Sequence, residues 1–137
     1  GSITAFYTVL TEGDDPQDPI ADAARGILDG HIVLSRELAE GGHFPAIDVE
    51  KSVSRVMTSV AAREHQLAAR RMRQLLAKVN KARDLIQLGA YQPGHDAELD
   101  TAVRLQPAML ELLQQDMHER SPLDAARGQL CHLMNLA

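Results

Sequence analysis

The sequence of 137 residues contains no tryptophan, only two Phe and two Tyr, and a single cysteine. Each of these shortages limits the kinds of core and the kinds of protein that fit the chain. With 3% aromatic but 45% hydrophobic residues, a core has to be built from Leu, Ile, Val, Met and Ala, a composition that favours helices. Cys131 cannot form an internal disulfide, so we interpret it as a buried, inert thiol in a protein of the reducing cytoplasm. No apolar run approaches the roughly 20 residues that span a bilayer, and no signal segment opens the chain. We therefore expect a soluble chain.

Motifs that identify a catalytic site by themselves are also missing. The sequence has no glycine-rich phosphate loop ending in Lys-Ser/Thr, no HExxH, no CxxC and no Ser or Cys nucleophile with a recognisable His partner. Six histidines are scattered without the spacing of metal ligands, and we interpret them as surface or capping residues: His31, His43, His65, His95, His118 and His132. We expect no metal site within the chain.

The first sixty residues alternate between strand and helix patterns. We predict a strand over residues 3–11, a helix from Pro19 to Leu28 capped by Asp18, a strand over residues 31–34 and a helical turn from Ser35 to Ala39. This alternation is typical of an α/β sheet. Two strands make no stable sheet, and the chain begins without Met, so we expect a fragment of something longer whose partner strands lie elsewhere.

From about residue 61 the pattern is helical throughout. We predict one long amphipathic helix that ends near Gly89, a loop over residues 91–96, a helix that starts at Asp96 and is ended by Pro107, a short helix after it, and a last helix after Pro122. The long helix has an apolar stripe made of Leu67, Met72, Leu75, Leu76, Val79, Ala82 and Ile86. The chain therefore reads as α/β followed by all-α.

The net charge of −5 conceals three segments whose charges alternate in sign, first negative, then positive, then negative. Residues 1–62 carry four basic and ten acidic side chains, residues 63–83 carry seven and one, and residues 84–137 carry three and eight. The basic helix fits a solvated face, a surface for an acidic protein or an anionic membrane, or a nucleic-acid site. The absence of aromatic residues from it disfavours nucleic acid.

Residues 42–55, GHFPAIDVEKSVSR, combine an aromatic-proline pair with an arginine flanked by serines on what reads as a short, turn-rich connection. An arginine there is commonly a surface or ion-paired residue. On an ordered turn, however, Arg55 is suited to stabilising negative charge, above all on phosphate.

Several stretches, in this order and spacing, resemble the closing third of the type III protein-export ATPases, the flagellar and injectisome relatives of the catalytic subunit of rotary ATP synthases. They are ITAFYTVL (3–10), DPIAD (18–22), LDGHIVLSR (28–36), GHFPAIDVEKSVSRVM (42–57), RDLIQLGAY (83–91) and GHD (94–96). The resemblance implies that residues 1–60 are the C-terminal end of a RecA-like P-loop nucleotide-binding domain and residues 61–137 a helical C-terminal domain.

What the resemblance implies about function is a Mg²⁺-dependent ATPase that forms a homo-hexameric ring at the cytoplasmic face of the inner membrane and energises type III secretion. Arg55 would be the arginine finger that reaches the phosphates of ATP on the neighbouring subunit, and Phe44 and Pro45 would pack against adenine. Tyr is more usual in the family than Phe at position 44, so a hydrogen bond from that position is lost. The phosphate loop and the Mg²⁺-binding aspartate would lie upstream, so we expect this chain alone to bind no ATP tightly and to hydrolyse none.

The helical part resembles the region of these ATPases that faces partners. The partners implied are stalk and stator proteins of the export apparatus and chaperone-substrate complexes. Arg70, Arg71 and Arg73 are the candidate docking residues. Peripheral membrane association is compatible with this interpretation, and nucleic acid is not expected as a partner. A non-catalytic helical adaptor or regulator is the alternative. A rotary ATP synthase subunit is a second rival, against which RDLIQLGAY and GHD favour the secretion branch. The sequence does not separate flagellar from injectisome export.

Overall fold

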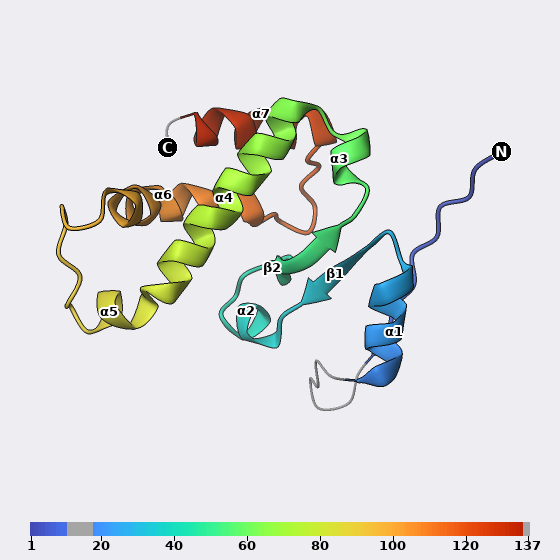
Figure 1. The fold of residues 1–137 in the computed structure, drawn as a ribbon, viewed down its shortest axis with the longest axis horizontal. Coiled ribbons are helices and arrows are strands. Elements are labelled where there is room, and N and C mark those ends of the chain that lie inside the picture. Colours follow the sequence, from blue (N-terminus) through green and yellow to red (C-terminus); the bar gives the residue numbers. More distant parts are fainter. Residues whose placement is uncertain (11–17, 136–137) are drawn as a thin grey trace.

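A computed structural model describes residues 1–10 and 18–135 (Figure 1). In these residues a helix-strand-helix-strand unit is followed by five helices. The elements are α1 (Pro19–Ile27), β1 (Gly30–Leu34), α2 (Arg36–Glu40), β2 (Ile47–Ser54), α3 (Met57–Val60), α4 (Arg63–Lys81), α5 (Arg83–Gln87), α6 (Ala97–Leu113) and α7 (Leu123–Met134). The predicted order of an α/β part followed by an all-α part is confirmed.

The sheet has two antiparallel strands, β1 and β2. The strand predicted over residues 3–11 is wrong for residues 3–10, which have no secondary structure and leave the body of the molecule (Figure 1); Thr11 lies outside the described residues. Ile3, Phe6 and Leu10 are each at least 90% exposed. Without a neighbouring strand, an apolar segment has neither ladder hydrogen bonds nor a surface to pack against, and its extended backbone is solvated instead.

The interpretation of residues 42–55 as a turn-rich connection is wrong for β2. Residues 47–54 form a strand that pairs with β1. Its apolar alternation, Ile47, Val49 and Val53, is interrupted by a polar stretch, which obscured the two-residue period.

Local capping signals predicted three helix starts correctly. Asp18 accepts hydrogen bonds from the N–H groups of Ile20 and Ala21, Ser35 from that of Leu38, and Asp96 from those of Glu98 and Leu99. A side chain of this kind satisfies the free N–H groups of a first helical turn and needs no distant partner.

Two helix boundaries differ from the sequence prediction. The long helix breaks at Ala82 into α4 and α5 instead of running to Gly89. Pro107 does not end α6, which continues through it to Leu113. Leu105 and Met109 are buried on either side of Pro107, so packing of this face outweighs the one backbone hydrogen bond that proline removes.

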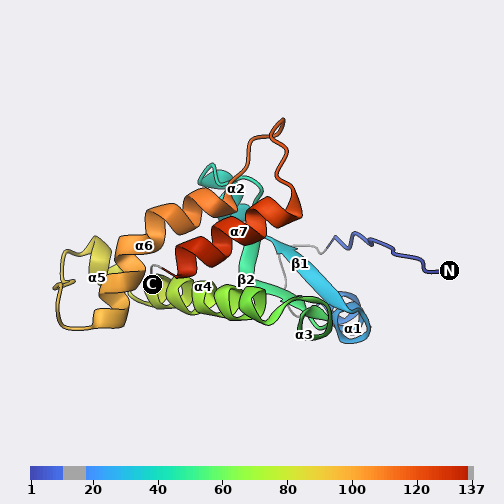
Figure 2. The same ribbon diagram turned by 90° about the horizontal axis from the view of Figure 1, so that it is seen from above.

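The hydrophobic core lies between α4, α6 and α7, which pack against one another (Figure 2). Leu75, Ala102 and Met109 have no exposed surface, and Cys131 packs against this core half-buried. The core is made of Ala68, Met72, Leu75, Leu76, Val79, Ala102, Leu105, Met109 and Met134. The helical part therefore holds the more complete core.

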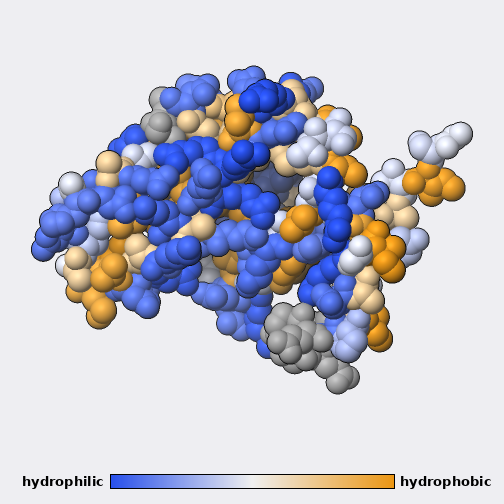
Figure 3. All heavy atoms as spheres, viewed as in Figure 1, coloured by the Kyte–Doolittle hydropathy of each residue, from blue (hydrophilic) through white to orange (hydrophobic). Residues whose placement is uncertain are grey.

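The α/β unit leaves much of its apolar surface uncovered. Ile20 and Ile27 of α1 are 74% and 85% exposed, and Ile32 and Leu34 of β1 are 64% and 72% exposed. Hydrophobic side chains accordingly gather along the right-hand edge of Figure 3, over the N-terminal segment and α1. The apolar side chains of α1 and β1 are thus largely uncovered.

Candidate functional site

The hairpin of β1 and β2 contains a large bulge. His31 pairs with Val53 and Val33 pairs with Asp48, so the single residue Ile32 on β1 faces four residues on β2. We call residues 49–52 the β2 bulge. Bulges bend a strand and redirect the residues that follow them, and the residue that follows β2 is Arg55.

The β2 bulge is held from within by Asp48 and Ser52. One carboxylate oxygen of Asp48 accepts from the N–H groups of Glu50 and Lys51, both at 3.1 Å, and the other lies 3.0 Å from Lys51 Nζ. Partial burial alone would raise the pKa of Asp48, but the hydrogen bonds from Lys51 and Glu50 outweigh it and hold that pKa below its usual range. Ser52 Oγ donates to the Asp48 carbonyl at 2.6 Å and accepts from Val33 N–H at 3.0 Å, replacing a missing strand contact.

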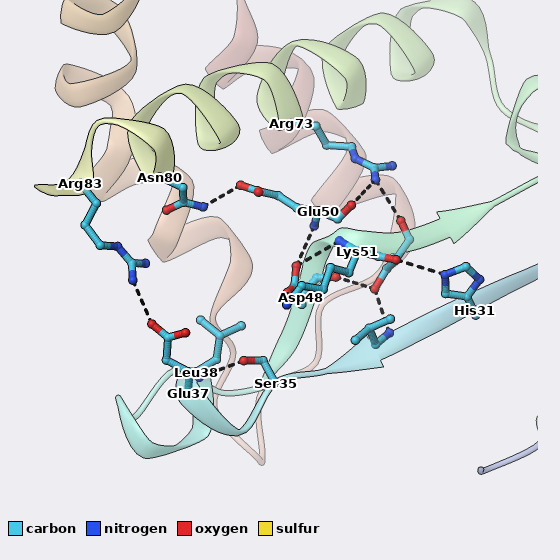
Figure 4. A network of polar contacts seen from close by, with 12 residues as sticks. His31, Ser35, Glu37, Leu38, Asp48, Glu50, Lys51, Arg73, Asn80 and Arg83 are labelled. Carbon is cyan, nitrogen blue, oxygen red and sulfur yellow. Dashed lines mark hydrogen bonds and ion pairs between the residues drawn. The ribbon is translucent and has the colours of Figure 1, made fainter. Parts of the chain in front are cut away.

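The bulge is also held from outside, by β1 and α4 (Figure 4). His31 Nε2 lies 3.1 Å from the Lys51 carbonyl. Arg73 Nη2 donates to the carbonyls of Glu50 and Ser52, at 2.8 and 3.0 Å. Asn80 Nδ2 donates to Glu50 Oε1 at 2.6 Å. Thus the helical part fixes the bulge through α4.

Arg55 lies at the end of this hairpin beside α1. Its N–H donates to the Asp29 carbonyl at 2.7 Å, and its Nη2 donates to the Arg25 carbonyl at 2.9 Å. The side chain is exposed, and within the described residues no carboxylate pairs with it. An exposed guanidinium held only by a carbonyl retains donors for an anion.

Phe44 and Pro45 lie just before the start of β2, at the end of the strand away from Arg55. They are joined by a cis peptide bond. Phe44 is 55% exposed. It borders a groove of about 910 Å³ whose other walls are the C-terminal end of α6, residues 114–121 and α7. An exposed aromatic face at the rim of an open groove fits a flat base.

Two hydrogen bonds join the Phe44 loop to the segment after α6. Gln115 N–H donates to the Phe44 carbonyl at 2.9 Å, and Gln114 Nε2 lies 3.2 Å from His43 Nδ1. His43 is only 8% exposed, so the interpretation of this histidine as a surface residue is wrong. Its burial comes from a contact 71 residues away in sequence, which local pattern does not reveal.

The predicted phosphate and adenine contacts therefore lie at opposite ends of β2. A strand of eight residues spans roughly 26 Å when regular and less with a bulge. Phe44 and Arg55 do not converge on one point. This arrangement fits two separate contacts better than a single pocket.

The three candidate docking arginines differ in their surroundings. Arg71 Nη1 lies 2.7 Å from Glu98, and Arg73 is held by the two carbonyls of the β2 bulge. Arg70 is exposed and makes no ion pair or side-chain hydrogen bond with the described part of the chain.

Much of the basic segment is neutralised internally. Lys78 Nζ lies 2.8 Å from Asp96 and 3.3 Å from Glu98, and Arg83 pairs with Glu37 at 2.9 Å. The ammonium of Lys78 lowers the pKa of Asp96, and Arg71 together with Lys78 lowers that of Glu98; Asp96 and Glu98 in turn raise the pKa of Lys78. The alternating charges of the three segments therefore join α4 to the start of α6 and α5 to α2.

Sequence reasoning missed the residues that shape the hairpin, namely His31, Asp48, Ser52 and the structural contact of Arg73. Polar residues four apart within a strand pattern, Asp48 and Ser52, are the one signal that points to the bulge.

Within residues 1–10 and 18–135 no three His, Cys, Asp or Glu side chains group as a metal site requires. None of the described helices has the length and apolarity that crossing a bilayer takes.

The sequence patterns of two families match the chain. That of the T3SS EscN ATPase C-terminal domain matches residues 61–132, and that of the nucleotide-binding domain of the ATP synthase alpha/beta family matches residues 1–54. The chain therefore belongs to the family of type III secretion and flagellar export ATPases and corresponds to their C-terminal region, the end of the nucleotide-binding domain followed by the helical C-terminal domain.

Individual relatives agree with this family. The chain is 56% identical over 134 residues to a flagellum-specific ATP synthase of Pseudomonas aeruginosa, covering 98% of the chain and 30% of that protein. The assembled ATPase EscN of the enteropathogenic E. coli type III secretion system superposes with a TM-score of 0.94 at 45% identity, over 98% of this chain and 32% of that one. EscN in complex with its central stalk EscO gives a TM-score of 0.80 at 41% identity, over 85% and 29%. The chain spans about a third of the length of the relatives it matches.

Proposed function

We propose that this chain is the C-terminal part of a cytoplasmic ATPase that energises type III protein export, injectisome or flagellar, as a homo-hexameric ring at the inner membrane. The observation that carries the proposal is Arg55, an exposed guanidinium without a carboxylate partner among the described residues, at the end of a strand that is fixed on both sides. The family membership supplies the reaction, hydrolysis of ATP with Mg²⁺.

In this proposal Arg55 acts as the arginine finger on ATP bound by the neighbouring subunit. Hydrolysis spreads negative charge over the oxygens of the transferred phosphoryl group, and a guanidinium held in place stabilises that charge without reorganisation. The carbonyl of Arg25 holds the side chain by one nitrogen, which leaves other N–H donors for phosphate oxygens.

Phe44 and Pro45 contact the adenine of the subunit's own nucleotide in this proposal. The exposed ring of Phe44 offers a face for stacking at the groove that it shares with residues 114–121. Because a strand separates Phe44 from Arg55, one subunit can contact two nucleotides, its own through Phe44 and the neighbouring subunit's through Arg55.

We assign residues 1–60 to the end of the RecA-like domain and residues 61–137 to the helical domain. The helical domain would dock stalk and stator proteins and chaperone-substrate complexes through Arg70, Arg71 and Arg73. The resemblance to EscN, which forms a complex with its central stalk EscO, supports the stalk as one partner. Of these three arginines, Arg70 is the one that makes no ion pair or side-chain hydrogen bond with the described residues.

The chain alone is expected to be inactive, because the sequence contains no phosphate loop to hold the β- and γ-phosphates. The purified 137 residues should neither bind ATP tightly nor hydrolyse it. Robust ATPase activity of the purified chain, abolished by Arg55→Ala, would overturn this part of the proposal.

The decisive experiment for the finger role is Arg55→Ala in the complete ATPase that carries this sequence. We expect kcat to fall by roughly 10³-fold or more, while nucleotide binding and thermal unfolding stay nearly unchanged. Lys81→Ala, which removes an exposed cation that has no partner among the described residues, is the control and should lower kcat far less. An Arg55→Ala enzyme with near-normal kcat would remove Arg55 from the finger role.

A further inference from the structure

We infer that Arg73 of α4 is a positioning residue for Arg55, holding the β2 bulge so that the arginine finger is correctly placed. The inference rests on the proposed function of Arg55. It adds a residue of the helical part that touches no nucleotide and acts through the hairpin. It also gives Arg73 a different role from the partner-docking role that the basic helix suggests.

The first observation is the contact itself. A single nitrogen, Arg73 Nη2, donates to two carbonyls of the β2 bulge, those of Glu50 and Ser52, at 2.8 and 3.0 Å. Residues in a bulge lack regular strand partners, so carbonyl groups there need other donors. A charged donor makes stronger hydrogen bonds than a neutral one, and Arg73 supplies it to two residues of the same short segment.

The second observation is the short and constrained path from this contact to Arg55. Only Val53 and Ser54 lie between Ser52 and Arg55, and they pair with His31 and Gly30 of β1. At Gly30 an added Cβ would lie 2.5 Å from the Val53 carbonyl oxygen, so the two strands are in close contact. Arg55 N–H is then bound to the Asp29 carbonyl. No loose loop therefore separates Ser52 from Arg55, and a shift of the backbone at Ser52 also shifts Arg55.

The third observation concerns what α4 is attached to. On the opposite side from the bulge, α4 carries Met72, Leu75 and Val79 into the core with α6 and α7. Asn80, two turns beyond Arg73, donates to the side chain of Glu50. Val49 of the bulge also packs against this core, and Arg73 adds a charged connection between α4 and the segment that ends in the finger (Figure 4).

The experiment compares Arg73→Met with Lys81→Met in the complete ATPase. Both substitutions remove one positive charge from α4, but Lys81 is exposed and has no partner among the described residues. For Arg73→Met we expect kcat to fall by roughly 10- to 100-fold, because small misplacements of a catalytic group have effects of this size, with KM for ATP and nucleotide binding changed less than about threefold. Lys81→Met should keep kcat within about twofold of the unmodified enzyme.

A double-mutant cycle separates positioning from general damage. If Arg73 acts through Arg55, adding Arg73→Met to Arg55→Ala should lower kcat no further, whereas independent effects would multiply. Arg73→Lys, which keeps the charge and can reach a carbonyl, should recover part of the lost kcat. If Arg73→Met fails to fold by thermal unfolding, Arg73→Gln is measured in its place under the same criteria.

The outcomes distinguish this inference from the proposed function. If Arg55→Ala retains kcat, the finger role fails and the inference fails with it. If Arg55→Ala loses kcat while Arg73→Met keeps it, or if the two effects multiply, the inference alone is overturned.

Discussion

The backbone N–H of Gln115 donates a hydrogen bond to the carbonyl of Phe44 at 2.9 Å. This contact ties the segment after α6 to the loop proposed to contact adenine. With the bond between Gln114 and His43 beside it, the helical part holds the Phe44 loop at one end of β2, as Arg73 holds the bulge near the other end. The hairpin is thus supported from the helical core at both of its proposed functional positions.

Replacing Phe44 by Ala in the complete ATPase should weaken nucleotide binding more than it slows catalysis. Loss of a stacked aromatic face costs on the order of 1–3 kcal/mol, so we expect Kd for ATP to rise by roughly tenfold or more and kcat to change by less than threefold. Binding of a fluorescent ATP analogue measures the first quantity and steady-state kinetics the second. Phe44→Tyr keeps the ring and serves as control; equal affinities of the Ala and Tyr variants would remove Phe44 from the adenine contact.

Reversing the charge of Arg70 should weaken association with an acidic stalk or chaperone partner. Arg71 and Arg73 have internal contacts, so Arg70→Glu changes the surface with the least disturbance of the fold. We expect a slower association rate, with a loss that shrinks as salt screens the charge. Surface plasmon resonance at two salt concentrations measures this, with Ser59→Glu on the exposed surface of α3 as the comparison. Binding that is indifferent to Arg70→Glu would mean that this side of α4 is merely solvated.

The contact between α4 and α6 should weaken in acid. Hydrogen bonding to Lys78 holds the pKa of Asp96 low, and Arg71 and Lys78 do the same for Glu98. A carboxylate whose pKa is depressed on folding contributes stability that is present above its unfolded pKa of about 4 and is lost as pH falls through the folded value. Urea unfolding of the chain between pH 6 and pH 3 should show this loss.

The variant Asp96→Asn isolates the charge in that experiment, since Asn remains a good N-cap for α6. We expect it to be less stable than the unmodified chain at pH 6 and to lose less stability on acidification. Glu40→Gln, at an exposed position, should follow the unmodified chain. A pH profile of Asp96→Asn parallel to that of the unmodified chain would contradict the role of the Lys78 pair.

The core between α4, α6 and α7 should be sensitive to cavities. Leu75 has no exposed surface and lies at the centre of α4, so Leu75→Ala should lower the free energy of unfolding by about 2–5 kcal/mol. Leu88, which is 82% exposed, provides the matched deletion, and Leu88→Ala should stay within about 0.5 kcal/mol. Equal losses for the two variants in urea unfolding would show that the core lies elsewhere.

The parts of the fold that sequence predicted correctly are those fixed by neighbouring residues. Asp18, Ser35 and Asp96 cap helices through N–H groups two or three residues away, so the relevant partners stand next to them in the sequence. The apolar stripe of α4 follows the helical period in the same way. Four of its seven predicted members, Met72, Leu75, Leu76 and Val79, are in the core.

The parts that were wrong depend on distant partners. Residues 3–10 have the composition of a strand but pair with no strand among the residues that the structure describes. Helix α6 passes through Pro107 because its buried face is packed by α4 and α7. The β2 bulge needs donors from β1 and α4. The functional roles of Arg55, Phe44 and Pro45 came from family resemblance and remain predictions.

The exposed apolar residues of the α/β unit have a consequence for work on the chain in isolation. A two-stranded sheet leaves an outer edge of unpaired N–H and C=O groups on each strand, and here Ile32 and Leu34 of β1 are exposed, while the N-terminal segment adds the exposed Phe6. Unpaired edges beside apolar side chains promote sheet extension between molecules. Solutions of the isolated chain should therefore become turbid as concentration rises, and removal of residues 1–10 should delay that point.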